Sequence, residues 1–121
     1  MRTIKFRGKD FAGTWWYGYP SLYEGNPVIH PLQCIGASMY VDEDSVGQFT
    51  GLTDADGKEI YEGDLLLSDE NAEVFEVVYD APRFCFKDND FGFRFLNHPE
   101  FFHVIGNIHD NKSLIEEGGN K

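Results

Sequence analysis

The sequence predicts an all-β protein, and three features of the chain support this. Apolar and polar residues alternate in short segments such as residues 3–7, 83–87 and 91–95, a pattern typical of half-buried strands. Glycine, proline and aspartate clusters separate these segments and indicate turns. Aromatic residues, which favour strands, make up 16% of the chain and include 11 phenylalanines. Since 121 residues suit a single core, we expect one domain, with an amino-terminal subregion (1–47), a core (48–110) and a tail (111–121).

The amino-terminal subregion predicts several short strands. Residues 3–7 place Ile4 and Phe6 on one face, and the aromatic residues 14–19 pair back on this strand as a hairpin. We expect Pro20 to end the second strand, because proline cannot donate a hydrogen bond to a sheet ladder. Residues 21–27 then read as a loop. Residues 28–35 predict a strand interrupted at Pro31, residues 38–41 another short strand, and the acidic residues 42–45 one turn of helix.

The central stretch, residues 48–64, carries the densest turn information. Residues 54–57 predict a type I turn closed by Gly57 at positive φ, the usual build of a short hairpin loop with a bulge. Asp54 can hydrogen-bond the backbone two residues further on. Residues 62–64 form a second sharp corner around Gly63, and an apolar run at 65–67 follows at once. We therefore expect a strand, a tight turn, a short arm, a corner and a buried strand.

The carboxy-terminal part predicts further strands. Residues 73–79 favour a strand, and residues 83–87 and 91–95 predict a hairpin turning at 88–90, with Phe84 and Phe86 on one face. This phenylalanine-rich hairpin is expected to be the main source of the core. Residues 101–108 predict a final strand interrupted by Gly106, and residues 111–117 a short helix.

The central stretch also resembles the signature of the YopX family, small proteins encoded by bacteriophages and prophages. Its flanks agree, in residues 4–8 with 15–19 and in residues 104–108 with the acidic tail. The signature residues in this chain are Gln48, Phe49, Thr50, Gly51, Leu52, Asp54, Asp56, Gly57, Tyr61, Glu62, Gly63 and Asp64. The resemblance implies a mostly β structure that contains a small SH3-type barrel. We expect this barrel to run from Phe49 to about Ile108, with the amino-terminal hairpin and the irregular segment after it packed against it. It implies no catalytic residues.

The charge balance excludes some partners. Ten Lys and Arg oppose 21 Asp and Glu, so the net charge is −11. A field of this sign repels phosphate backbones and anionic membranes, so we expect neither nucleic acid nor membrane as a partner. No apolar segment follows Arg2, Lys5 and Arg7, so we expect no signal peptide, and no apolar run approaches the roughly 18 residues of a membrane span. We therefore expect a cytoplasmic location in the bacterial host, with Cys34 and Cys85 reduced.

No chemical motif stands out, so we expect no enzyme activity, cofactor or metal. Setting Gly57 at position six of a calcium loop places Leu52 and Gly63 where acidic ligands are needed. His98, His103 and His109 lie near one another but lack a zinc-ligand spacing. Cys34 follows His30 without an oxyanion-hole loop, and no glycine-rich phosphate loop is present.

The aromatic cluster Trp15, Trp16, Tyr17 and Tyr19 is the candidate binding surface. In a strand Trp15, Tyr17 and Tyr19 share one face and Trp16 the other, so one set could equally be core. The favoured function is a non-enzymatic accessory protein of a phage or prophage that binds another phage or host protein; a homo-oligomer is possible. One alternative is an acidic decoy that mimics nucleic acid and occupies a host nuclease or regulator. Another is a small enzyme without a recognisable motif.

Overall fold

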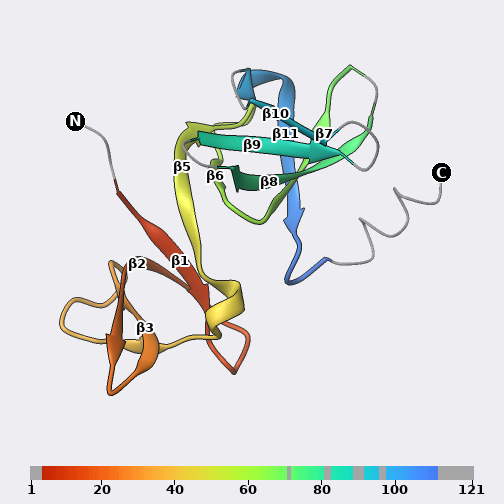
Figure 1. The fold of residues 1–121 in the computed structure, drawn as a ribbon. Helices are drawn as coiled ribbons and strands as arrows, with labels where there is room; N and C mark the ends of the chain where they lie inside the picture. Colours follow the sequence, from red (N-terminus) through yellow and green to blue (C-terminus); the bar gives the residue numbers. More distant parts are fainter. Residues whose placement is uncertain (1–3, 71, 81–82, 89–91, 96–97, 112–121) are drawn as a thin grey trace. The chain divides into compact units, whose positions relative to one another are not determined.

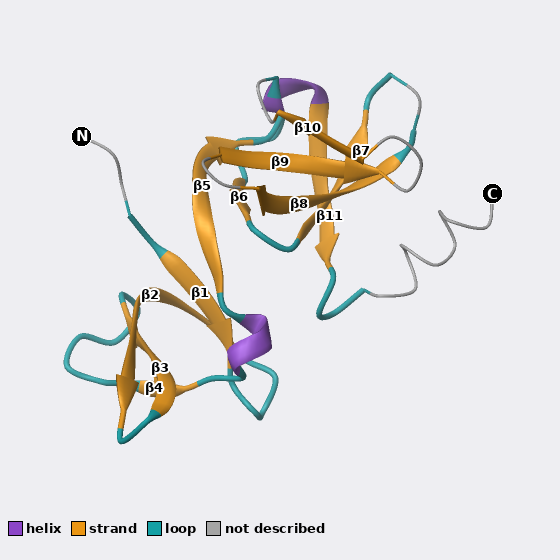
Figure 2. Ribbon diagram, viewed as in Figure 1, coloured by secondary structure: helices purple, strands orange, loops and turns teal. Residues whose placement is uncertain are grey.

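The computed structural model describes residues 4–70, 72–80, 83–88, 92–95 and 98–111. These residues form antiparallel strands and two 3-10 helices of one turn each, which confirms the all-β prediction (Figures 1 and 2). The chain divides into two compact units, Met1–Gly51 and Leu52–Lys121. None of the helices in the described residues has the length and apolar character that crossing a membrane requires.

The first unit is built on a sheet in the order β4-β3-β2-β1-β5, and β6 follows β5 in the same hydrogen-bonded order. Its elements are β1 (Phe6–Lys9), β2 (Trp15–Tyr23), β3 (Asn26–Pro31), β4 (Met39–Tyr40), η1 (Glu43–Ser45) and β5 (Gly47–Thr53). Val28, Ile29 and Val41 are buried. A Cβ atom at Gly8 would lie 2.9 Å from the Val41 side chain, so the close approach of β1 to this core requires glycine.

Strand β2 corrects the expected end at Pro20, because it continues to Tyr23 and pairs with β3 along its whole distal half. Within β2, only Trp15 to Gly18 pair with β1. Pro20 therefore lies in an edge section of the strand, where proline is tolerated. The expected loop over residues 21–27 shrinks to Glu24 and Gly25, both at positive φ, as in a two-residue hairpin turn. The expected short strand at 38–41 and helical turn at 42–45 are confirmed as β4 and η1.

The central stretch forms the predicted elements. Strand β5 leads into the turn at residues 54–57, then into β6 (Glu59–Tyr61), a corner, and the buried strand β7 (Asp64–Ser68). Gly57 lies at φ +83° and Gly63 at φ +92°, which confirms both glycine-dependent corners.

The second unit contains a five-stranded sheet in the order β10-β9-β8-β7-β11. Its remaining strands are β8 (Val74–Asp80), β9 (Arg83–Asp88), β10 (Gly92–Phe95) and β11 (Phe102–Asn107), with η2 (Pro99–Phe101) before β11. The predicted SH3-type barrel is not what these sheets form. A barrel closes only where its two outermost strands pair, whereas β10 and β11 are the two edges of this sheet. The amino-terminal hairpin itself is formed by β1 and β2, and its packing against the rest of the chain stays a prediction.

Among the described residues, the core of the second unit centres on side chains outside the expected phenylalanine hairpin, whose own contribution stays a prediction because the side chains of Phe86, Phe93 and Phe95 lie outside the described residues. Its buried cluster consists of Ile60, Leu66, Phe75, Val77 and Phe102, with the Phe75 and Phe102 rings edge to face at 5.9 Å. The hairpin of β9 and β10 does form, but the Phe86 side chain and the turn at 89–90 lie outside the described residues. So does the predicted helix beyond residue 111. Strand β11 carries the expected irregularity, between Val104 and Gly106.

Candidate functional site

Two hairpin turns of the chain are built alike, and one of them positions the aromatic cluster. Asp10 opens the turn between β1 and β2, and its Oδ1 accepts hydrogen bonds from the N–H groups of Ala12 and Thr14 at 2.9 and 2.8 Å. Asp54 opens the turn between β5 and β6, and its Oδ1 accepts from Asp56 and Lys58 at 2.9 and 2.8 Å. Both turns have the sequence Asp-x-x-Gly, with the glycine at positive φ.

The second carboxylate oxygen distinguishes the two turns. Asp10 Oδ2 accepts the indole N–H of Trp16 at 2.9 Å. Mainly through this bond and that from Thr14, the pKa of Asp10 lies below its ordinary value. Asp54 Oδ2 instead accepts the N–H of Val104 in β11 at 2.8 Å. Burial alone would raise the pKa of Asp54, but the three backbone N–H groups outweigh burial and the pKa is lowered. Asp54 thus joins the central turn to the last strand.

The predicted binding residues differ in how firmly they are held. Trp15, Trp16 and Tyr17 are half-buried. The Arg7 guanidinium lies 4.7 Å from the centre of the Trp15 ring, a cation–π contact. Trp16 is fixed by Asp10, whereas Tyr19 is 56% exposed. These contacts give Trp15 and Trp16 structural partners within the hairpin, so the more accessible side chains lie further along β2.

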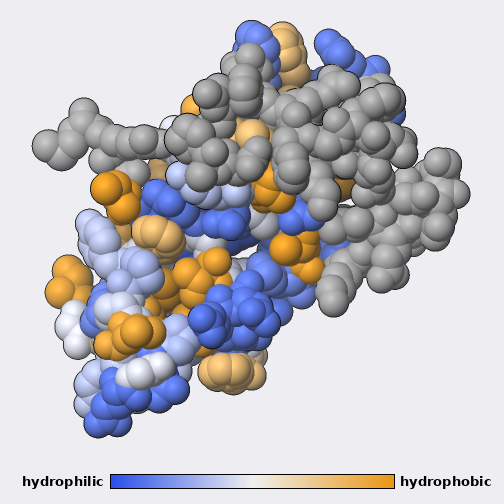
Figure 3. All heavy atoms as spheres, viewed as in Figure 1, coloured by the Kyte–Doolittle hydropathy of each residue, from blue (hydrophilic) through white to orange (hydrophobic). Residues whose placement is uncertain are grey.

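An exposed group of tyrosines lies on the distal half of this hairpin. Strand register places Tyr19 opposite His30, Tyr23 opposite Asn26, and Tyr40 of β4 opposite Val28. Directly opposed residues point to the same side of a sheet, so Tyr19, Tyr23 and Tyr40 share one face, here called the tyrosine face. All three are about half exposed. The rings of Tyr23 and Tyr40 meet edge to face, with centroids 6.3 Å apart. Figure 3 shows hydrophobic and hydrophilic residues interspersed over the visible side of the molecule.

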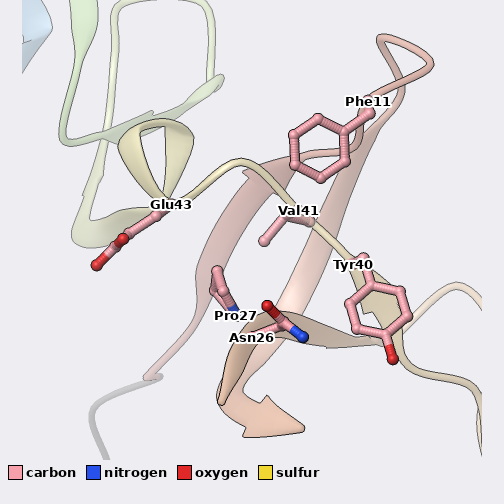
Figure 4. Close-up of a pocket in the computed structure, with 6 residues that line it drawn as sticks. All are labelled: Phe11, Asn26, Pro27, Tyr40, Val41 and Glu43. Carbon is pink, nitrogen blue, oxygen red and sulfur yellow. The ribbon is translucent and has the colours of Figure 1, made fainter. Parts of the chain in front are cut away.

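A pocket of about 470 Å³ adjoins the tyrosine face, within the range of roughly 300–1,000 Å³ common for ligand sites. Figure 4 shows the rings of Phe11 and Tyr40 around Val41, with Glu43 at the rim and its carboxylate directed outward. The lining residues are Phe11, Asn26, Pro27, Tyr40, Val41 and Glu43. Tyr40 therefore belongs both to the pocket and to the tyrosine face.

A second polar cluster surrounds His103 in the other unit. His103 Nδ1 lies 2.8 Å from Asp56 Oδ2, and Nε2 lies 2.5 Å from Asp69 Oδ1. Hydrogen bonds to Asp56 and then Asp69 raise the pKa of His103 above its ordinary value of 6.5. His103 is thus engaged by two carboxylates on its two ring nitrogens. Across the described residues, no group of three or more His, Cys, Asp and Glu side chains is placed to hold a metal ion.

Most signature residues of the central stretch are buried or half-buried, or take part in its two turns. Asp64 is 1% exposed, and its Oδ2 accepts the Tyr61 N–H at 2.7 Å, which fixes the second corner. Phe49, Thr50 and Tyr61 are buried and Gln48, Leu52 and Glu62 half-buried, while Gly51 and Asp56 are exposed. Sequence reasoning did not identify Phe11, Tyr23, Tyr40 or Glu43. A large apolar residue inside a turn was the available signal for Phe11, since turns are usually polar.

The fold and these surfaces define a small all-β protein with exposed apolar side chains on its first unit. A model of the YopX protein family matches residues 5–116. The chain therefore belongs to the YopX family, in agreement with the resemblance of its central stretch.

A similar solved structure is protein EF1440 from Enterococcus faecalis. It has 26% sequence identity and a TM-score of 0.66, and the match covers 95% of this chain and 99% of EF1440. No curated protein sequence matches the chain.

Proposed function

We propose that this protein is a non-enzymatic module that binds another protein through the tyrosine face of its first unit. The observation that carries this proposal is the exposure of Tyr19, Tyr23 and Tyr40 on one side of a sheet. In this proposal the protein serves a bacteriophage or prophage as an accessory protein in the cytosol of the bacterial host. The partner is accordingly a phage or host protein.

Physical chemistry favours such a role for these side chains. Tyrosine combines a large apolar ring with a hydroxyl group that can hydrogen-bond at the edge of an interface. Tyrosine is enriched in protein interfaces and among the residues that dominate binding energy. Leu22, which is 72% exposed on the same strand, lies between Ser21 and Tyr23 and therefore points to the opposite side of the sheet, outside the tyrosine face.

The acidic-decoy alternative receives less support from the arrangement of carboxylates. Asp54 and Asp64 are buried and accept backbone hydrogen bonds. Asp56 and Asp69 both bind His103. These four carboxylates are therefore engaged within the fold, which leaves fewer of them available to mimic phosphates.

Affinity capture from a lysate of the bacterial host, with and without phage infection, tests the proposal. The parent protein is compared with Tyr23→Ala and with the matched control Tyr79→Ala. Tyr79 of β8 is also about half exposed and meets Phe84 edge to face at 5.1 Å, so both variants lose a comparable side chain. We expect a protein retained by the parent and by Tyr79→Ala but lost from Tyr23→Ala. Equal retention by all three would contradict binding through the tyrosine face.

A further inference from the structure

The pocket beside the tyrosine face has a feature that its local fold does not require. Phe11 lines it from the turn between β1 and β2, although this residue is 81% exposed. The equivalent position in the similarly built turn at Asp54 is occupied by Ala55. Since the second turn keeps the same carboxylate hydrogen bonds with alanine there, phenylalanine is not needed to form the turn.

An exposed phenylalanine is unfavourable in water unless something covers it, because burying apolar surface away from water lowers the free energy. Phe11 stands with Tyr40, Val41 and Pro27 around one hollow (Figure 4). These side chains come from three separate segments of the first unit. Together they offer an apolar recess rather than a single exposed ring.

Charge at the rim specifies what could enter. Glu43 is the one charged residue among the six that line the pocket. It lies in η1 between two further exposed carboxylates, Asp42 and Asp44. Lys9 adjoins this turn through the hydrogen bond from Asp42 N–H to its carbonyl oxygen, 2.8 Å long. Three consecutive carboxylates outnumber this lysine, so the rim favours a positively charged neighbour.

We infer that this pocket receives an apolar side chain of a partner protein that is flanked by a lysine or arginine residue. The apolar side chain packs between Phe11 and Tyr40, and the basic group lies near Glu43. The inference rests on the proposed protein-binding function and gives the partner segment its chemistry. An acidic segment of a partner would not bind at this pocket, because the carboxylates at the rim would repel it.

Selection from a library of random linear heptapeptides displayed on yeast tests this inference with the purified full chain. We expect enriched peptides to carry an aromatic or aliphatic residue next to lysine or arginine. Their dissociation constants are then measured by fluorescence anisotropy for the parent and three variants. Phe11→Ala should weaken binding about tenfold or more, as expected for loss of a central aromatic contact. Glu43→Gln should weaken it several-fold, whereas the matched control Glu70→Gln, at an exposed carboxylate that does not line the pocket, should stay within about twofold of the parent.

Several results would overturn the inference. No enrichment, enrichment without a basic residue, or peptides whose affinity survives both Phe11→Ala and Glu43→Gln would each do so. A dimer of the free protein that Phe11→Ala dissociates would show that a second copy fills the pocket instead. Peptides that lose affinity with Tyr23→Ala alone would refute the pocket while leaving the tyrosine face, and the proposed function, intact.

Discussion

Replacing Asp54 with asparagine tests how the central turn is held to the rest of its unit. Asp54 is 6% exposed, and its carboxylate accepts three backbone hydrogen bonds of 2.8 to 2.9 Å. Hydrogen bonds to a charged group contribute about 1.5–3 kcal/mol each. Asp56 and Lys58 are exposed, so water can satisfy their N–H groups in the variant, while Val104 is half-buried. Asparagine keeps one acceptor oxygen but no charge, and we expect the free energy of unfolding to fall by about 2–4 kcal/mol.

Urea unfolding followed by circular dichroism at pH 7 measures this loss, and Asp10→Asn is the matched control. Asp10 makes equivalent turn hydrogen bonds, but water reaches its carboxylate more easily, so its replacement should cost less. The folded-state pKa of Asp54 is depressed from 3.8, so its contribution is present above that pH and is lost as pH falls through the folded pKa. The free energies of unfolding of the parent and of Asp54→Asn should therefore converge as the pH falls through the folded-state pKa. A loss under about 0.5 kcal/mol at pH 7, or one equal to that of Asp10→Asn, would refute this reasoning.

Three further predictions concern the turn, the histidine and the charge. Gly57 lies at φ +83°, and no atom outside its chain neighbours stands within 4 Å of the position that a Cβ would take. Gly57→Val should therefore lower the free energy of unfolding by about 1–2 kcal/mol through backbone strain alone, and Gly57→Asn should lower it distinctly less. Equal melting temperatures of the two variants in thermal unfolding would contradict this. The pKa of His103 is raised, so the stability it adds is present below pH 6.5 and is lost as pH rises through the folded pKa; proton NMR titration should show the raised pKa, and His103→Gln should flatten the pH dependence. With a net charge of −11, the protein should not shift duplex DNA at physiological salt, and micromolar binding would reveal a basic patch.

Local sequence patterns predicted the parts of the fold that local chemistry determines. The turn at Asp54, the corner at Gly63 and the strand over residues 73–79 all follow from backbone preferences within a few residues. The prediction that Pro20 ends β2 was wrong. Whether a strand can contain proline depends on whether a neighbouring strand needs its N–H, and β1 is too short to reach Pro20. Whether the sheet closes depends on pairing between β10 and β11, which no local motif reports.

The candidate site was predictable only in part, for the same reason. The aromatic cluster drew attention to β2, but the contacts that hold Trp15 and Trp16 come from Arg7 and Asp10. The exposed tyrosines become one surface only through the register of three strands. His103 lies 47 residues from Asp56 and 34 from Asp69 in the chain, so no spacing rule connects them.

The central claim is that the tyrosine face binds a protein, and the affinity of the isolated captured partner tests it most directly. Dissociation constants are measured by isothermal titration calorimetry at two salt concentrations for the parent, Tyr23→Ala, Tyr79→Ala and the double variant Glu70→Gln/Glu73→Gln. Asp69 is left intact because it holds His103. We predict that Tyr23→Ala weakens binding about 30-fold, or about 2 kcal/mol, with little change from the other variants and a shallow dependence on salt. Unchanged affinity for Tyr23→Ala, together with steep salt dependence and weaker binding by the double variant, would contradict the claim and favour the acidic decoy.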